Sequence, residues 1–84
     1  MIMGELILMQ LVELIENEFL YSEKELSVNS IIKDDFQFDE IDLVEILSRL
    51  EELLALKFNF IEIPEEIFKM SLLEFVAFLE QNIV

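Results

Sequence analysis

FDEIDLVEILSRLEELL, residues 38–54, is the stretch that decides the fold. Its apolar residues recur at steps of three and four, which gives the single stripe of an amphipathic helix. They are Leu43, Ile46, Leu47, Leu50, Leu53 and Leu54. Asp39 is placed to accept a first-turn backbone N–H, and Asp42, three residues later, to cap in return. The stretch therefore predicts a helix over about Glu40–Leu56.

The composition predicts one small domain, residues 1–84, of the all-α class. Of the 84 residues, 55% are hydrophobic, eight of them Phe, against roughly 45–50% in typical domains. This is enough for a core, and the excess predicts some exposed apolar surface. One Gly and one Pro leave few chain breakers, which favours helices over a turn-rich β fold.

The net charge of −14 limits the classes of partner. Nucleic acid and anionic membrane surfaces are repelled, whereas a basic protein surface is attracted. A second interpretation is that the acids form a solvated face that keeps an apolar domain soluble.

Residue types that carry catalysis or bind metals are scarce. The chain has no Cys and no His, so thiol nucleophiles, thiolate–zinc sites and the usual general base are absent. The carboxylate pairs Asp34/Asp35 and Glu51/Glu52 lack Ca²⁺-loop spacing, and adjacent helical residues point in different directions. We therefore expect no enzymatic activity, no catalytic residue and no metal site.

The apolar opening, Met1–Ile15, is interrupted by three polar residues, Glu5, Gln10 and Glu13. It is too short and too acidic for a membrane span, and it lacks the basic start of a signal peptide. We therefore expect a cytoplasmic protein.

The rest of the chain predicts two longer helices and one short one. An apolar stripe of Leu8, Leu11, Val12, Ile15 and Phe19 predicts a first helix over about Ile2–Leu20. Residues 21–37 lose this periodicity but keep apolar anchors, which indicates a long loop pinned to the core. Pro64 suits the start of a short helix, Glu65–Phe68. Ser71 and Glu74 form a capping-box pattern for a last helix that ends near Gln81.

The central stretch resembles the second helix of acyl carrier proteins, Asp-Ser-Leu-Asp-x-Val-Glu-Leu-x-x-x-Leu-Glu-Glu. The run from Asp39 reads DEIDLVEILSRLEE, with identities at Asp39, Asp42, Val44, Glu45, Leu50, Glu51 and Glu52. The family's Glu-Ile-Pro-x-Glu recurs as residues 62–66. The resemblance implies a four-helix bundle of three longer helices and one short helix, with a long first loop.

The resemblance also implies where a phosphopantetheine arm is attached, and there this chain departs from the family. Glu40 occupies the position of the attachment serine, and a carboxylate cannot form the phosphodiester. We therefore predict no phosphopantetheine at Glu40. The carboxylate either stands in for the phosphate charge at the helix N-terminus, which favours anions, or is a solvent-exposed acid without a role. A genuine carrier using another serine would need Ser48 or Ser30.

Without an attachment serine at position 40, the function that the resemblance still implies is docking to a partner protein. Five acids correspond to the family's docking face: Asp39, Asp42, Glu45, Glu51 and Glu52. The implied partner is the basic surface of an acyl-transfer or synthase-type enzyme of fatty-acid or polyketide-type metabolism. The alternative is a plain helical interaction module that associates with itself or with another protein through its surplus apolar surface.

Overall fold

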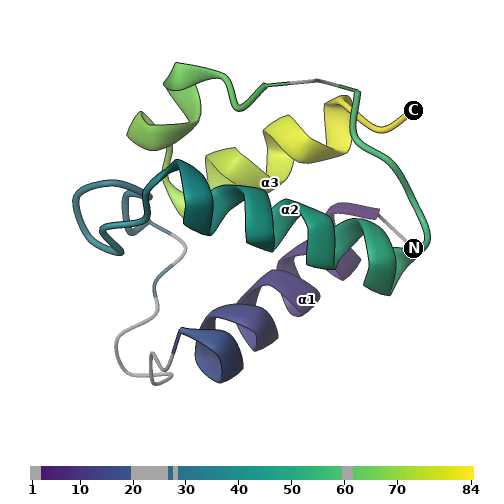
Figure 1. Ribbon diagram of the computed structural model, residues 1–84, viewed down its shortest axis with the longest axis horizontal. Coiled ribbons are helices and arrows are strands. Elements are labelled where there is room, and N and C mark those ends of the chain that lie inside the picture. The colour runs from purple at the N-terminus through teal and green to yellow at the C-terminus, as the bar shows by residue number, and fades with distance from the viewer. Residues whose placement is uncertain (1–2, 20–26, 28, 60–61) are drawn as a thin grey trace.

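Three α-helices and one short 3-10 helix make up the regular structure of the described residues (Figure 1). The computed structural model describes residues 3–19, 27, 29–59 and 62–84. The elements are α1 (Met3–Glu18), α2 (Glu40–Leu54), η2 (Glu65–Lys69) and α3 (Leu72–Gln81). Within these ranges there is no strand, only two isolated β-bridges that join Ile31 to Ser71 and Phe58 to Ile83. The all-helical class is thus confirmed.

The element bounds differ from the predicted ones in two places. The short helix expected at Glu65–Phe68 is a single stretch of 3-10 helix, and Pro64 is its N-cap rather than its first residue. A bundle of four helices is therefore not confirmed. The central helix ends at Leu54 instead of Leu56, because Ala55 adopts the left-handed conformation (φ 52°, ψ 49°) that terminates helices. The predicted ends of the first helix, Ile2 and Leu20, lie outside the described residues.

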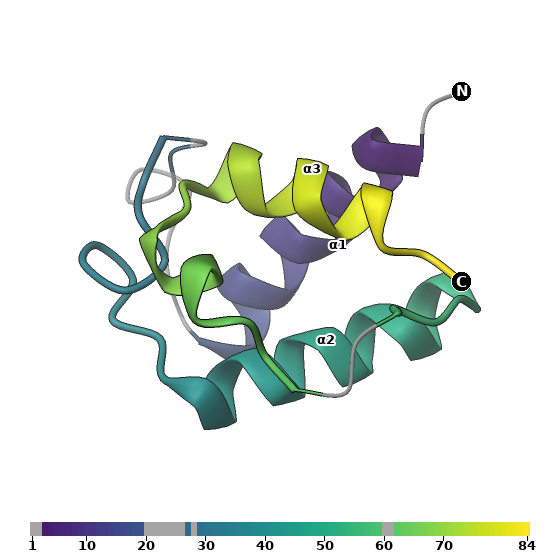
Figure 2. The same cartoon turned by 90° about the horizontal axis from the view of Figure 1, so that it is seen from above.

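The core forms where the apolar stripes of the helices meet, with α1 packed against both α2 and α3 (Figures 1 and 2). Each α-helix buries four side chains: Ile7, Leu11, Leu14 and Ile15; Leu43, Ile46, Leu47 and Leu50; and Leu72, Phe75, Val76 and Leu79. The radius of gyration is 11.7 Å, close to the roughly 12 Å expected of a compact domain of this length. Leu53, predicted to belong to the stripe, is instead 55% exposed.

Both predicted capping boxes are present. Asp39 accepts the backbone N–H of Asp42 at 2.9 Å, and the Asp42 carboxylate accepts that of Asp39 at 3.1 Å. Ser71 and Glu74 make the equivalent pair at the start of α3. These reciprocal bonds satisfy N–H groups that lack partners inside a helix, so they fix where α2 and α3 begin.

Residues 30–33, in the loop before α2, are pinned to residues 68–72, at the end of η2 and the start of α3, by a set of backbone hydrogen bonds, here called the loop junction. The N–H of Ile32 donates to the carbonyl of Met70 at 3.0 Å, and that of Lys33 to Phe68 at 3.1 Å. The N–H of Leu72 donates to the carbonyl of Ser30 at 2.9 Å. Ile32 is 1% exposed, so the predicted anchoring of the loop is confirmed at this residue; two other anchors, Leu26 and Val28, lie outside the described residues.

At the opposite end of the molecule, the C-terminal residues are hydrogen-bonded to the segment that follows α2. The N–H of Val84 donates to the carbonyl of Lys57 at 2.8 Å, next to the bridge between Phe58 and Ile83. The Glu80 carboxylate accepts the N–H of Gly4 at 2.8 Å and so caps the first turn of α1 from α3. The start of α1 and the end of α3 therefore lie on the same side of the molecule (Figures 1 and 2).

The left-handed end of α2 predicts that Ala55→Gly stabilises the protein. A left-handed L-residue costs about 1–2 kcal/mol, whereas glycine adopts this conformation freely at some cost in chain entropy. We expect the free energy of unfolding in a urea titration to rise by about 0.5–1 kcal/mol.

The matched control is Ala77→Gly, at an exposed position inside α3. This change should lower the free energy of unfolding by about 1 kcal/mol. A loss of stability in both variants would contradict the assignment of Ala55 as a left-handed cap.

Candidate functional site

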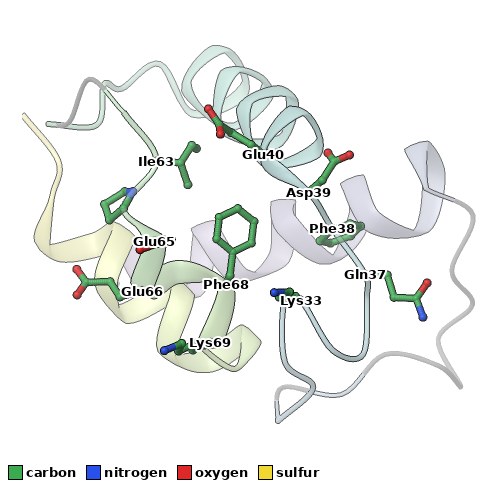
Figure 3. A pocket seen from close by; sticks show the side chains of 11 residues that line it. Lys33, Gln37, Phe38, Asp39, Glu40, Ile63, Glu65, Glu66, Phe68 and Lys69 are labelled. Atoms are coloured by element: carbon green, nitrogen blue, oxygen red, sulfur yellow. The ribbon is translucent and has the colours of Figure 1, made fainter.

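The start of α2 lies beside an open groove whose other wall is η2 (Figure 3). The groove has a volume of about 1140 Å³. Its apolar lining comes from Phe38, Ile63, Pro64 and Phe68, and its charged lining from acids on α2 and η2 and from two lysines. Two of the predicted site residues, Asp39 and Glu40, line this groove.

Phe38 is fixed at the base of this site by other aromatic rings. It is 4% exposed, stacks on Phe36 with ring centroids 5.3 Å apart, and meets Phe19 of the segment after α1 at 4.9 Å. Phe38 is thus packed at the start of α2, and Phe58, which is 8% exposed, is packed just beyond the other end of the helix. Phe68 is half-buried and lines the groove, and Phe60 lies outside the described residues.

Glu40 is the first residue of α2 and is exposed to solvent. It lines the groove and also two smaller hollows, of about 440 Å³ over Ile41 and Val44 and about 230 Å³ toward Ser48 and Phe58. The carboxylate therefore stands where these three hollows meet. At a helix N-terminus such an exposed charge stabilises the helix by about 0.3–1 kcal/mol.

The five predicted docking acids do not have equivalent surroundings. Asp39 and Asp42 are engaged in the capping box. Glu51 is half-buried, and its carboxylate accepts the backbone N–H of Phe58 at 2.9 Å, which anchors the chain as it leaves α2. Glu45 and Glu52 are exposed. Of the five, Glu45 and Glu52 are thus the acids best placed to meet a partner without giving up a bond to the backbone.

Arg49, which interrupts the acidic face in sequence, is directed toward α1. Its guanidinium lies 3.1 Å from the carboxylate of Glu18, and both side chains are partly exposed. A surface ion pair of this kind contributes at most about 1 kcal/mol. Its main consequence here is that the positive charge is partly neutralised on the α1 side of α2.

The structure adds functional candidates that the sequence patterns did not single out. Ile41 and Val44 are 78% and 50% exposed on α2, next to Glu40. Lys33 and Lys69 line the groove, although they are far apart in sequence. Ile41 and Val44 follow a helical spacing and so could have been found from the sequence, whereas the two lysines are brought together by the loop junction, which leaves no local signal.

A metal ion and a phosphopantetheine arm each need particular side chains. No group of three or more potential metal ligands occurs there. At the helix start Glu40 offers a carboxylate and no hydroxyl, so the attachment position does not fit the arm. Ser48 is exposed on α2, two turns from Glu40, and the carbonyl of Ser30 is held in the loop junction.

In the described ranges no helix combines the length and apolar character needed to cross a membrane. No protein-family model matches the chain, and no curated protein or solved structure matches it significantly.

The bond between Glu51 and Phe58 predicts a clear difference between two adjacent acids. Glu51→Ala leaves the Phe58 N–H without its acceptor, and we expect the free energy of unfolding to fall by about 1–2 kcal/mol. Glu52→Ala removes the same charge from an exposed site and should change it by less than about 0.5 kcal/mol. Urea titrations of both variants measure the difference, and equal effects would mean that the bond does not stabilise the fold.

Proposed function

We propose that this protein is an acyl-carrier-protein-like domain that acts by docking to basic partner enzymes and carries no phosphopantetheine at Glu40. The observation that carries the proposal is the combination, on the first turns of α2, of an exposed acid at the attachment position with exposed apolar and acidic neighbours. The class of partner is an acyl-transfer or synthase-type enzyme with a basic surface.

The order of elements supports the carrier-like interpretation. Residues 29–39 lead without a helix into α2, and the DEIDLVE stretch begins at this boundary. The short helical element after Pro64 lies across the groove from this point (Figure 3). A family carrier presents its attachment serine at such a loop–helix boundary, where a helix N-terminus favours the phosphate charge.

The distribution of charge and apolar surface supports docking. Ile41 and Val44 are exposed beside Glu40, and Glu45 and Glu52 continue the exposed acidic face along α2. An apolar centre flanked by charges of one sign is an arrangement found in protein interfaces, where the charges speed association with a complementary partner.

A plain interaction module is a second candidate function, favoured by the spread of exposed apolar residues. Besides those at the start of α2, Met9 on α1, Leu53 on α2 and Leu73 on α3 are each more than half exposed. A tight homo-oligomer that is insensitive to salt and indifferent to carrier-dependent enzymes would favour this function over the first.

Phosphopantetheine transfer tests the assignment of Glu40. The protein and a Glu40→Ser variant are each incubated with coenzyme A and a broad-specificity phosphopantetheinyl transferase, and their intact masses are measured. We expect only the variant to gain the arm. Modification of the unaltered protein would contradict the proposal, and modification of neither would favour the plain interaction module.

The rate of that modification tests the docking face. In the Glu40→Ser background, Glu45→Lys and Glu52→Lys should each slow the transferase severalfold, because each replaces an attractive charge by a repulsive one. The control is Glu13→Lys, an equally large charge change at an exposed position on α1. Equal rates in all three variants would show that α2 is not the docking face.

A further inference from the structure

The groove between α2 and η2 has a rigid floor. Two backbone hydrogen bonds hold the loop against the end of η2. The N–H of Lys33 donates to the carbonyl of Phe68 at 3.1 Å, and that of Ile32 to the carbonyl of Met70 at 3.0 Å. Ile67, between the two groove residues Glu66 and Phe68, is fully buried. A surface built on these contacts is formed before a ligand arrives, which lowers the entropy cost of binding.

The centre of the groove is apolar. Figure 3 shows the ring of Phe68 standing between Ile63 on one side and Phe38 on the other. Phe68 and Ile63 are half-buried, so part of each side chain still faces solvent. An apolar side chain inserted here would bury surface that the protein leaves exposed to water.

The rim of the groove is polarised. Asp39 and Glu40 lie at the α2 edge and Glu65 and Glu66 at the start of η2, so four carboxylates border the groove. Lys33 and Lys69 lie on the side of Phe68 away from Glu40 (Figure 3). Among the described residues neither lysine makes an ion pair with an acid.

We infer that the groove seats a segment of a basic protein partner, with an apolar side chain against Phe68 and Ile63 and Lys or Arg side chains against the carboxylates of Glu40, Glu65 and Glu66. The two lysines orient the segment, because its basic residues avoid that side of the rim. For the class of partner, a basic protein, this inference rests on the proposed function. The site itself is distinct from the outer face of α2 that carries Glu45 and Glu52.

Charge decides between this occupant and a small amphiphilic anion such as a fatty acid. Two lysines face four carboxylates on the rim, and the whole chain carries −14. The field around the groove is therefore negative and attracts a cationic segment. The positive charges of the two lysines do not outweigh this negative field, so a free anion is not attracted to the groove.

The inference is tested with a fluorescein-labelled amphipathic peptide of lysine and leucine. Its binding to the protein is measured by fluorescence anisotropy. Ile63→Lys places a charge in the apolar centre, and Met9→Lys makes the same change in charge at an exposed apolar residue of α1. We expect the peptide to bind at least about tenfold more weakly to the first variant than to the second, as for a residue at an interface centre.

A second pair of variants keeps the test valid if Ile63→Lys fails to fold. Glu66→Lys and Glu13→Lys both change an exposed acid to a base, so diffuse attraction to the acidic protein falls equally in the two. We expect Glu66→Lys to weaken the peptide severalfold more than Glu13→Lys does. Equal losses within both pairs, or no binding of the peptide at all, would overturn the inference.

Three further outcomes separate this inference from its alternatives. Preferential binding of dodecanoate, lost in Lys33→Glu and Lys69→Glu, would replace the basic segment by an amphiphilic anion. Peptide binding that is lost in Glu45→Lys and Glu52→Lys but unchanged in the groove variants would overturn the groove while leaving the proposed docking face of α2 intact. Loss of peptide binding in the groove variants alone, with no effect of the α2 charges on the transferase rate, would support the groove and overturn the proposed docking face of α2.

Discussion

The loop junction is the connection on which the arrangement of the other elements depends. Its hydrogen bonds hold residues 30–33 against residues 68–72, and those two segments lead into α2 and α3. The N–H of Phe38 also donates to the carbonyl of Ile32 at 3.2 Å, so the start of α2 is tied to the same point. Because η2 ends there as well, one set of backbone bonds determines how α2 and η2 face each other, and thereby shapes the groove.

The acidity of the chain has two physical roles. Six described carboxylates accept a backbone N–H, and these belong to Asp35, Asp39, Asp42, Glu51, Glu74 and Glu80. Such bonds satisfy backbone N–H groups at helix starts and turns, which have no partner inside a helix. The remaining exposed acids, Glu40, Glu45 and Glu52 among them, create the field that a basic partner would meet. Net charge alone does not separate these roles, whereas the hydrogen bonds do.

The features that could be predicted from the sequence are those that local sequence signals encode. The stripe of α2 and the capping boxes at Asp39 and Ser71 depend on residues within a few positions of one another, and both capping boxes are confirmed. The end of α2 at Ala55 was missed because alanine favours helix, and its left-handed conformation depends on the tertiary packing. The bond from Phe58 to Glu51 and the shared position of Lys33 and Lys69 on the groove arise from contacts that no periodicity reveals. For that reason the acids of α2 could be predicted as a face, but not divided into structural and free members.

Glu40 connects the two surfaces proposed for binding, since it lines the groove and also the hollow over Ile41 and Val44. At the attachment position of a carrier protein, a serine would bear a long flexible arm. A glutamate there puts a fixed negative charge at a rigid helix start, where the dipole stabilises it. Under the proposed function, Glu40 has an electrostatic role in place of a covalent one at this position. A partner that recognises this end of α2 would meet the carboxylate, the exposed Ile41 and the groove together, and its specificity would come from matching all three.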